Sequence, residues 1–216
     1  MILGIGAGRP GSITERTVRA ILEETGLESE FVSLSDKTIG GCTECLACAA
    51  DNRCKLADDF LPISEKLLAA EALVFGAPNF YDRLNARGHA LLERAAYSFH
   101  HNNVYAIGGR PYVSVSTEWI RPRLGRPGDP VREAVDFFLE HASRMHRVGH
   151  VTAFGYGCCF TCGFGHDCTA GGAYTEKSVR IGGFEPEDLP PTYDEQPETQ
   201  KAVKTAAAAL KSALRQ

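Results

Sequence analysis

Short apolar segments alternate with stretches of helical periodicity along most of the 216-residue chain. Five segments rich in aliphatic residues are expected as strands, at 2–6, 31–34, 72–78, 111–116 and 148–154. Between them, apolar residues recur at helical spacing within 12–24, 60–68, 86–99 and 131–145. Because strands that alternate with helices form parallel sheets covered on both faces, the sequence predicts a doubly wound α/β fold with a five-stranded parallel sheet.

The end of the chain follows a different pattern. Residues 185–198 contain four prolines and six acidic residues without a basic one, which is typical of a linker. Residues 200–214 repeat apolar side chains at helical spacing and predict an amphipathic helix, which either completes the domain or packs on a partner subunit. We expect a domain over 1–184, with cysteine-rich loops at 39–55 and 157–172, followed by linker and helix over 185–216.

Composition excludes several classes of protein. The net charge of −4 and the pI of about 6.0 argue against a nucleic-acid-binding protein, which usually carries a basic surface. No run of 18 apolar residues is long enough to cross a membrane. The first residues, Met-Ile-Leu-Gly, lack the basic and long apolar regions of a signal peptide. We therefore expect a cytoplasmic protein without nucleic-acid or membrane partners.

A glycine-rich turn joins the first strand to the first helix. Residues 6–11, Gly-Ala-Gly-Arg-Pro-Gly, formally match the dinucleotide fingerprint G-x-G-x-x-G. The neighbouring guanidinium and hydroxyl groups favour a terminal phosphate instead, because they and a helix N-terminus suit a phosphate dianion. Ser12 is also a plausible N-cap, with Glu15 completing a capping box. The predicted anion-binding residues are Gly8, Arg9, Gly11, Ser12 and Thr14.

Two segments resemble the flavodoxin-like NAD(P)H-dependent FMN reductase family. The turn resembles that family's phosphate loop, Gly-Ser-Pro-Arg…Ser-x-Thr, with Ala7 and Gly8 replacing the serine and proline. Residues 76–81, Gly-Ala-Pro-Asn-Phe-Tyr, resemble the family's segment against the flavin ring. The resemblance implies a flavodoxin-like fold and FMN as cofactor. The flavin contacts that we expect beyond the phosphate loop are Pro78, Asn79, Phe80, Tyr81, Ser116, Thr117 and Trp119. The alternative for the two aromatic residues of 76–81 is that they only cap the core.

The eight cysteines form two tight groups, and the first has the spacing Cys-x2-Cys-x2-Cys-x5-Cys. Its members are Cys42, Cys45, Cys48 and Cys54. Thiolates spaced in this way can wrap one corner of a cuboidal iron–sulfur cluster, and the fourth closes it. The spacing resembles the iron–sulfur flavoprotein branch of the same family, which implies a [4Fe–4S] cluster. A zinc site and a motif without metal remain alternatives.

The second cysteine group follows the fifth predicted strand. Its members are Cys158, Cys159, Cys162 and Cys168, and the last three repeat the Cys-x2-Cys-x5-Cys spacing of the first group. We hypothesise that this group binds a second [4Fe–4S] cluster, with Cys158 or His166 as the fourth ligand. Structural zinc and a disulfide or dithiol pair remain alternatives.

These patterns predict an iron–sulfur flavoprotein, an electron-transfer oxidoreductase whose cofactors carry the chemistry. The expected electron partner is a ferredoxin-like carrier, docked on a basic loop with Arg121, Arg123 and Arg126, or NAD(P)H. His100 and His101 are expected as helix caps. The resemblance implies a homodimer or homotetramer. The alternatives are an NAD(P)H-dependent FMN or quinone reductase without a cluster and a zinc-stabilised, non-redox binding module.

Overall fold

The computed structural model describes residues 1–118, 129–155 and 191–215. Five strands form one sheet in the order β2-β1-β3-β4-β5, and every neighbouring pair is parallel. The five-stranded doubly wound sheet predicted from the sequence is therefore confirmed. The strands are β1 (Ile2–Gly6), β2 (Ser29–Ser33), β3 (Ala72–Pro78), β4 (Pro111–Glu118) and β5 (His146–Phe154).

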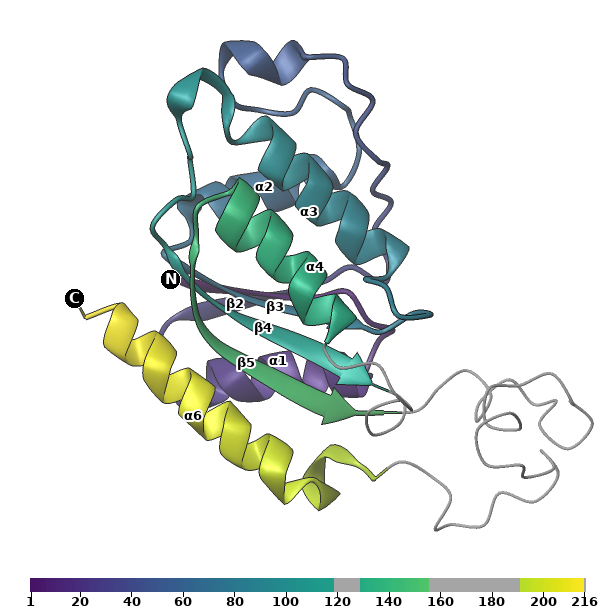
Figure 1. Cartoon of the computed structure of the whole chain (residues 1–216), viewed down its shortest axis with the longest axis vertical. Helices are drawn as coiled ribbons and strands as arrows, with labels where there is room; N and C mark the ends of the chain where they lie inside the picture. Colours follow the sequence, from purple (N-terminus) through teal and green to yellow (C-terminus); the bar gives the residue numbers. More distant parts are fainter. Residues whose placement is uncertain (119–128, 156–190, 216) are drawn as a thin grey trace, which may run out of the picture.

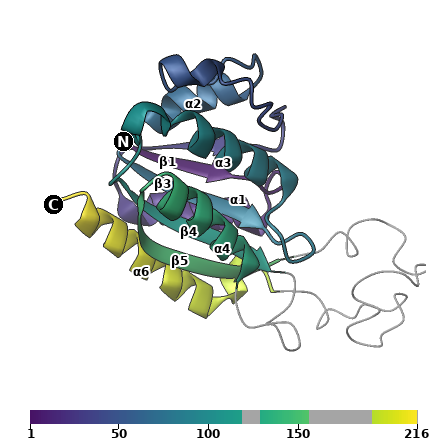
Figure 2. The same cartoon turned by 45° about the horizontal axis from the view of Figure 1, so that its top comes forward.

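Helices cover both faces of the sheet (Figure 1, Figure 2). Helices α1 (Ile13–Thr25) and α6 (Pro197–Ala213) lie on one face. The other face carries α2 (Phe60–Ala69), α3 (Ala86–Ser98) and α4 (Pro130–Asp136). Shorter helical segments are η1 (Ala47–Ala50), η2 (His101–Asn103), the π-helical η3 (Phe137–Ala142) and η6 (Tyr193–Glu195).

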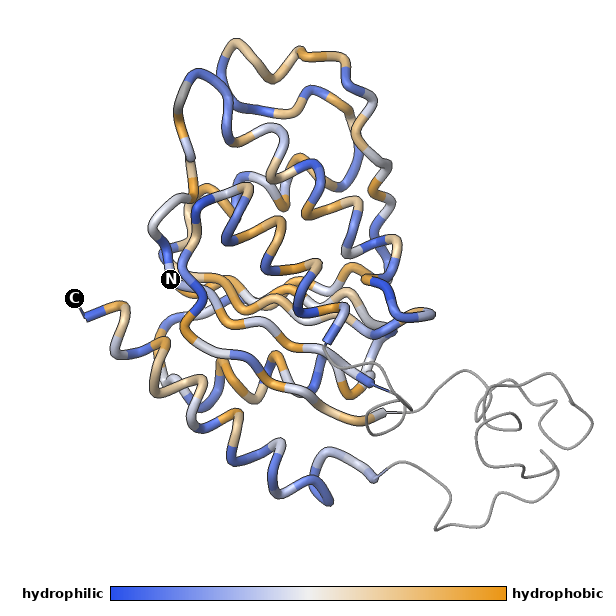
Figure 3. The backbone as a smooth tube through the Cα atoms, in the orientation of Figure 1, coloured by the Kyte–Doolittle hydropathy of each residue, from blue (hydrophilic) through white to orange (hydrophobic). Residues whose placement is uncertain are grey.

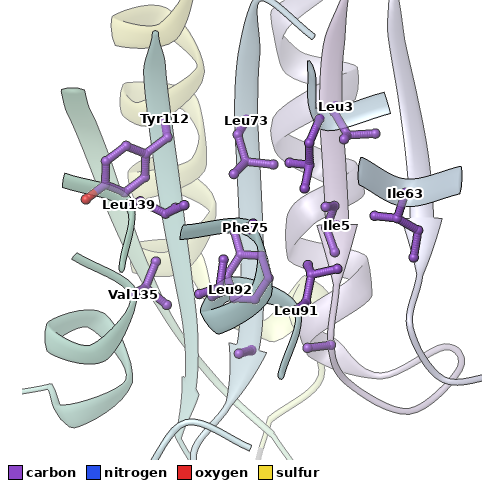
Figure 4. Packing of buried hydrophobic residues seen from close by; sticks show 14 of the residues in the cluster. Leu3, Ile5, Ile63, Leu73, Phe75, Leu91, Leu92, Tyr112, Val135 and Leu139 are labelled. Carbon is purple, nitrogen blue, oxygen red and sulfur yellow. The ribbon is translucent and has the colours of Figure 1, made fainter. Parts of the chain in front are cut away.

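Two apolar clusters hold the layers together. On the α3 face, Leu3 and Phe75 of the sheet pack with Leu91 of the helix (Figure 4). On the opposite face, Val203 and Leu210 of α6 join the cluster that α1 forms with the strands. The tube coloured by hydropathy shows apolar residues concentrated along the strands between these layers (Figure 3). The terminal helix is thus packed into the same fold as the strands.

Two elements differ in detail from the sequence prediction. The helix expected over 131–145 ends its α-helical part at Asp136 and continues as η3, in which the Ser143 amide bonds the Phe138 carbonyl. The expected linker overlaps α6, because Pro197 is the first residue of that helix. Proline is well tolerated there, since the first helical amide has no intrahelical partner. In the described residues, no helix is both long and apolar enough to cross a membrane.

The fold brings the predicted flavin loops together at one edge of the sheet. Parallel pairing aligns Gly6 of β1 with Gly76 of β3, and Pro78 of β3 with Thr117 of β4. The Ala7 amide donates to the Gly76 carbonyl at 2.8 Å, and the Asn79 amide to the Thr117 carbonyl at 2.9 Å. The segments after β1 and β3 and the end of β4 therefore adjoin at the carboxyl edge, where doubly wound sheets bind ligands.

Candidate functional site

The turn after β1 brings two hydroxyls close over Gly8. A Cβ atom on Gly8 would lie 2.5 Å from the Ser12 hydroxyl and 3.0 Å from the Thr14 hydroxyl. The buried Thr14 hydroxyl also lies 2.8 Å from the Thr117 hydroxyl of β4. Gly11 adopts a left-handed conformation with φ of 65°, and Arg9 is exposed on the same turn. Hydroxyls thus gather over a glycine at the N-terminus of α1, as an anion site requires.

The predicted capping box forms only in part. Ser12 is the N-cap of α1 and accepts a hydrogen bond from the Glu15 amide at 3.4 Å. The Glu15 carboxylate does not return to the Ser12 amide; it accepts from the Gly11 amide at 3.0 Å and from the Ser33 hydroxyl. Glu15 therefore braces the glycine turn against β2, and the Ser12 hydroxyl remains beside Gly8.

The turn after β3 exposes two aromatic rings. Phe80 and Arg83 exchange backbone hydrogen bonds of 2.9 and 3.0 Å, which closes a two-residue turn. Its central residues, Tyr81 and Asp82, have φ values of 54° and 58°, as in a type I′ turn. Such φ values cost non-glycine residues about 1–2 kcal/mol each. The Phe80 and Tyr81 side chains are 58% and 93% exposed, so they do not cap the core.

The residues expected to contact the flavin near the end of β4 differ in their surroundings. Asn79 donates to the Glu118 carboxylate at 2.7 Å, while the buried Asn79 carbonyl oxygen has no hydrogen-bond partner among the described residues. Thr117 faces the glycine turn through Thr14. Ser116 is fully buried, and its hydroxyl donates to Asp129 instead. Trp119 lies outside the described residues.

A polar network beside Ser116 was not foreseen from the sequence. We call it the Asp129 cluster; its members are Ser114, Ser116, Asp129, His150 and Thr152. His150 lies between Asp129, 2.9 Å from Nε2, and Ser114, 2.8 Å from Nδ1. Burial opposes the charged form of Asp129, but hydrogen bonds from His150, the Arg132 amide and Ser116 outweigh it and lower its pKa to about 2.

The first cysteine group gathers at one pocket, which we call the cysteine pocket. Cys42, Cys45, Cys48 and Cys54 carry free thiols and line its wall. Left-handed residues at Glu44, Leu46 and Asn52 allow the chain to wrap around it. In the described chain, no group of three or more His, Cys, Asp or Glu residues is arranged to hold a metal ion. A cuboidal cluster takes each thiolate on a different iron, so its ligands surround a core instead of meeting at one ion.

The four thiols affect one another electrostatically. Burial raises the pKa of the Cys48 thiol, and its neighbours Cys54, Cys42 and Cys45 raise it further. The backbone amide of Ala47 and the hydroxyl of Thr43 lower the pKa of the exposed Cys45. Four thiolates crowded in this way repel one another, and a cationic iron core would neutralise that repulsion. The donor set therefore fits a cluster.

Two side chains next to the cysteines were missed or misjudged from the sequence. Arg94 of α3 donates to the Cys54 sulfur at 3.2 Å. His101 was expected as a helix cap, but its Nε2 lies 3.1 Å from the Cys48 sulfur. His100 does lie at the helix end, with Nδ1 2.5 Å from the Ala96 carbonyl oxygen. Sequence spacing gives no signal for these contacts, because they join segments about 40 to 53 residues apart.

The cysteine pocket and the carboxyl edge lie at opposite ends of α3. The turn that exposes Phe80 and Tyr81 precedes the first residue of α3, whereas Tyr97 in its last turn lines the pocket. At 1.5 Å per residue, Ala86 and Tyr97 are about 16 Å apart along the helix. The second cysteine group (158, 159, 162 and 168), His166 and the arginines at 121, 123 and 126 lie outside the described residues.

Comparisons with known protein sequences identify the family of this chain. Residues 1–121 match the sequence model described as NADPH-dependent FMN reductase. An iron–sulfur flavoprotein of Methanocaldococcus jannaschii is 30% identical over 148 residues, which cover 65% of this chain and 72% of that protein. An iron–sulfur flavoprotein of Methanosarcina thermophila is 34% identical over 98 residues, or 44% of this chain and 51% of that protein.

Solved structures support the fold. RosB, solved with a bound flavin-phosphate intermediate, superposes with a TM-score of 0.61 at 14% identity over 99% of this chain and 78% of its own. An archaeal flavodoxin superposes with a TM-score of 0.51 at 10% identity, over 98% and 99%. The flavodoxin-like fold predicted from the sequence is confirmed.

Fold, loops and relatives together define a flavin-dependent oxidoreductase. The chain belongs to the NADPH-dependent FMN reductase family, and within it to the iron–sulfur flavoprotein branch.

Proposed function

We propose that this oxidoreductase binds FMN at the carboxyl edge of the sheet and one [4Fe–4S] cluster in the cysteine pocket, and that it transfers electrons between them. The observation that carries this proposal is the position of four free thiols on the wall of one pocket. FMN exchanges electrons in pairs or singly, whereas a cluster exchanges one, so the two cofactors together connect two-electron and one-electron partners.

The residues of the carboxyl edge bind and orient the flavin. The hydroxyls of Ser12 and Thr14 and the amides around Gly8 hold the phosphate, with Arg9 and Gly11 on the same turn. Phe80 and Tyr81 offer their exposed rings to one side of the flavin. The buried Asn79 carbonyl oxygen has no hydrogen-bond partner among the described residues, so it is an acceptor at the same edge that is available to a flavin N–H group.

We propose that electrons pass between the two sites across protomers. The two sites adjoin opposite ends of α3, whose residues Ala86 and Tyr97 are about 16 Å apart along the helix. A homodimer or homotetramer would place the cysteine pocket of one protomer against the flavin edge of another. We propose this assembly, with a ferredoxin-like carrier or NAD(P)H as the electron partner and a second cluster at cysteines 158, 159, 162 and 168.

Anaerobic purification followed by cofactor analysis tests the proposal. We expect broad iron–sulfur absorption together with the flavin bands, and iron and sulfide in equal amounts for two clusters per chain. Flavin without iron would support the cluster-free reductase, and a colourless protein with zinc would support the binding module. If the protein holds iron for only one cluster, and substitution of the first cysteine group removes that iron, the second cluster is refuted.

Reduction assays identify the electron partner. Rapid flavin reduction by NADPH in the absence of a carrier supports the nucleotide, whereas reduction by a reduced ferredoxin supports the carrier. Docking of an acidic carrier on a basic loop should weaken as ionic strength rises. A carrier-driven rate that does not change with salt would refute that docking mode.

A further inference from the structure

Arg94 is a buried cation on the wall of the cysteine pocket. Its side chain is 1% exposed, which is rare for an arginine, and its guanidinium lies 4.3 Å over the Phe60 ring. One end of the guanidinium donates to the Cys54 sulfur at 3.2 Å and to the Leu56 carbonyl at 3.4 Å. The other end pairs with the Asp58 carboxylate and donates to the Gly40 carbonyl at 3.3 Å.

These contacts hold a full positive charge beside a cysteine sulfur. Arginine stays protonated in proteins at any ordinary pH. The charge next to Cys54 is therefore permanent, and the surrounding protein screens it less than water would.

The guanidinium also has an unused donor. Arg94 Nε is buried and has no hydrogen-bond partner among the described residues. Leaving a buried donor unpaired is unfavourable. Because Arg94 lines the cysteine pocket, its charge would lie next to a cluster bound there. Hydrogen bonds to cluster sulfurs and nearby charge are two of the factors that set the potential of such clusters.

We propose that Arg94 is a positioning residue that raises the reduction potential of the cluster in the cysteine pocket by stabilising its reduced form. This inference rests on the proposed function of that pocket. On reduction the cluster gains one electron and no proton, so its charge becomes more negative by one unit. A fixed cation attracts the reduced form more strongly than the oxidised form, which favours reduction. The Asp58 carboxylate on the far side of Arg94 partly offsets this effect.

Redox titration of the Arg94→Gln protein tests the proposal. With dithionite as the electron donor and electron paramagnetic resonance as the readout, we expect the ratio of reduced to oxidised cluster to fall at least tenfold at a fixed potential. For a one-electron couple, tenfold corresponds to a shift of about 59 mV. Iron and sulfide analysis of the same sample reports cluster loading. An Arg94→Gln protein that is fully loaded and keeps the wild-type potential would refute the role of Arg94 while leaving the cluster itself supported.

Two further variants make the test independent of how well Arg94→Gln folds. Asp58→Asn removes the offsetting anion, so the potential should rise; an unchanged or lower potential overturns the proposal. Arg53→Gln removes an exposed arginine next to Cys54 that pairs with Glu65 in solvent, and the potential should stay unchanged.

If neither Arg94→Gln nor Asp58→Asn loads a cluster, the Arg94–Asp58 pair is needed for assembly and the tuning role is refuted. A wild-type chain without iron refutes the proposed function and this inference together.

Discussion

The cysteine pocket and the Asp129 cluster are both polar regions on the same face of the sheet, but they differ in what their polar atoms lack. In the Asp129 cluster, each oxygen of Asp129 and both ring nitrogens of His150 have partners within the chain. In the cysteine pocket, four thiols converge without forming a disulfide, and Arg94 Nε has no partner among the described residues. A closed network stabilises the fold, whereas an open one is completed by a ligand.

This difference predicts distinct effects for variants in the two regions. A substitution in the closed network should lower the free energy of unfolding and leave cofactor content unchanged. A substitution in the cysteine pocket or at the proposed flavin edge should change cofactor content or affinity. It should change the free energy of unfolding of the apoprotein less. Each variant below is therefore measured for both properties.

Cys48→Ala should have the largest effect. Cys48 is the most buried of the four thiols, and removing it leaves a cuboidal cluster without one of its ligands. We expect loss of one cluster's worth of iron and sulfide per chain, with flavin content retained. Tyr97→Phe changes another residue of the same pocket without removing a thiol, and it should keep the full iron content. Retention of iron by Cys48→Ala would remove this cysteine from the ligand set.

Asp129→Asn should have the next largest effect, on stability and not on cofactors. The pKa of Asp129 is lowered to about 2, so its charged form stabilises the fold above pH 4 by about 2 kcal/mol. For a carboxyl with a lowered pKa, this stabilisation is lost as the pH falls from about 4 towards 2. We expect Asp129→Asn to be less stable than the wild type at neutral pH. Its free energy of unfolding should also change less than that of the wild type as the pH falls from about 4 towards 2.

Denaturant unfolding at a series of pH values measures this effect. Asp36→Asn is the matched control, because Asp36 is exposed and pairs with Lys37 in solvent. Its unfolding profile should follow that of the wild type. If Asp129→Asn instead lowered the flavin content at unchanged stability, the Asp129 cluster would belong to the flavin site and the contrast with the cysteine pocket would fail.

Gly8→Ala should weaken FMN binding about tenfold or more. The added Cβ would come within 2.5 Å of the Ser12 hydroxyl, so the hydroxyls over the turn must move from their positions. Tenfold corresponds to about 1.4 kcal/mol of binding free energy. Quenching of FMN fluorescence during titration of the apoprotein gives the Kd. Gly41→Ala, whose nearest neighbour would be 3.5 Å away, should bind FMN as the wild type does; equal affinities for both variants would place the phosphate elsewhere.

Local patterns in the sequence predicted the fold well. Strand and helix periodicity is a local property, so the order of the elements and the five-stranded sheet followed from it. The spacing of Cys42, Cys45, Cys48 and Cys54 is local too, and the structure brings these thiols to one pocket. The capping box was predicted less well, because Glu15 has competing partners at Gly11 and Ser33.

Contacts between distant segments were not predictable in this way. His150 and Ser114 belong to neighbouring strands, and Asp129 reaches them from the start of α4. None of the three residues stands in a recognisable motif. Arg94 likewise resembles any other residue of an amphipathic helix until α3 is placed against the cysteine loop. Only strand register and helix packing bring such groups together, and a single sequence does not specify either one directly.

Tyr81→Asn should have the smallest effect, and it should raise stability while lowering the affinity for FMN. Tyr81 is held at φ of 54° in a two-residue turn, a conformation that asparagine adopts several-fold more readily than other non-glycine residues. Since the side chain is 93% exposed, little packing is lost. We expect the variant to be more stable by about 0.5 kcal/mol, which raises Tm by about 1–2 °C. FMN binding should weaken less than tenfold, because the variant lacks the exposed ring that we propose covers the flavin. Tyr105→Asn, at an exposed tyrosine outside the flavin edge, should give neither the gain in stability nor the loss in affinity. A gain in stability with unchanged FMN affinity would mean that the strained turn serves something other than the flavin, since strain of this kind persists where the surrounding structure and a function require it.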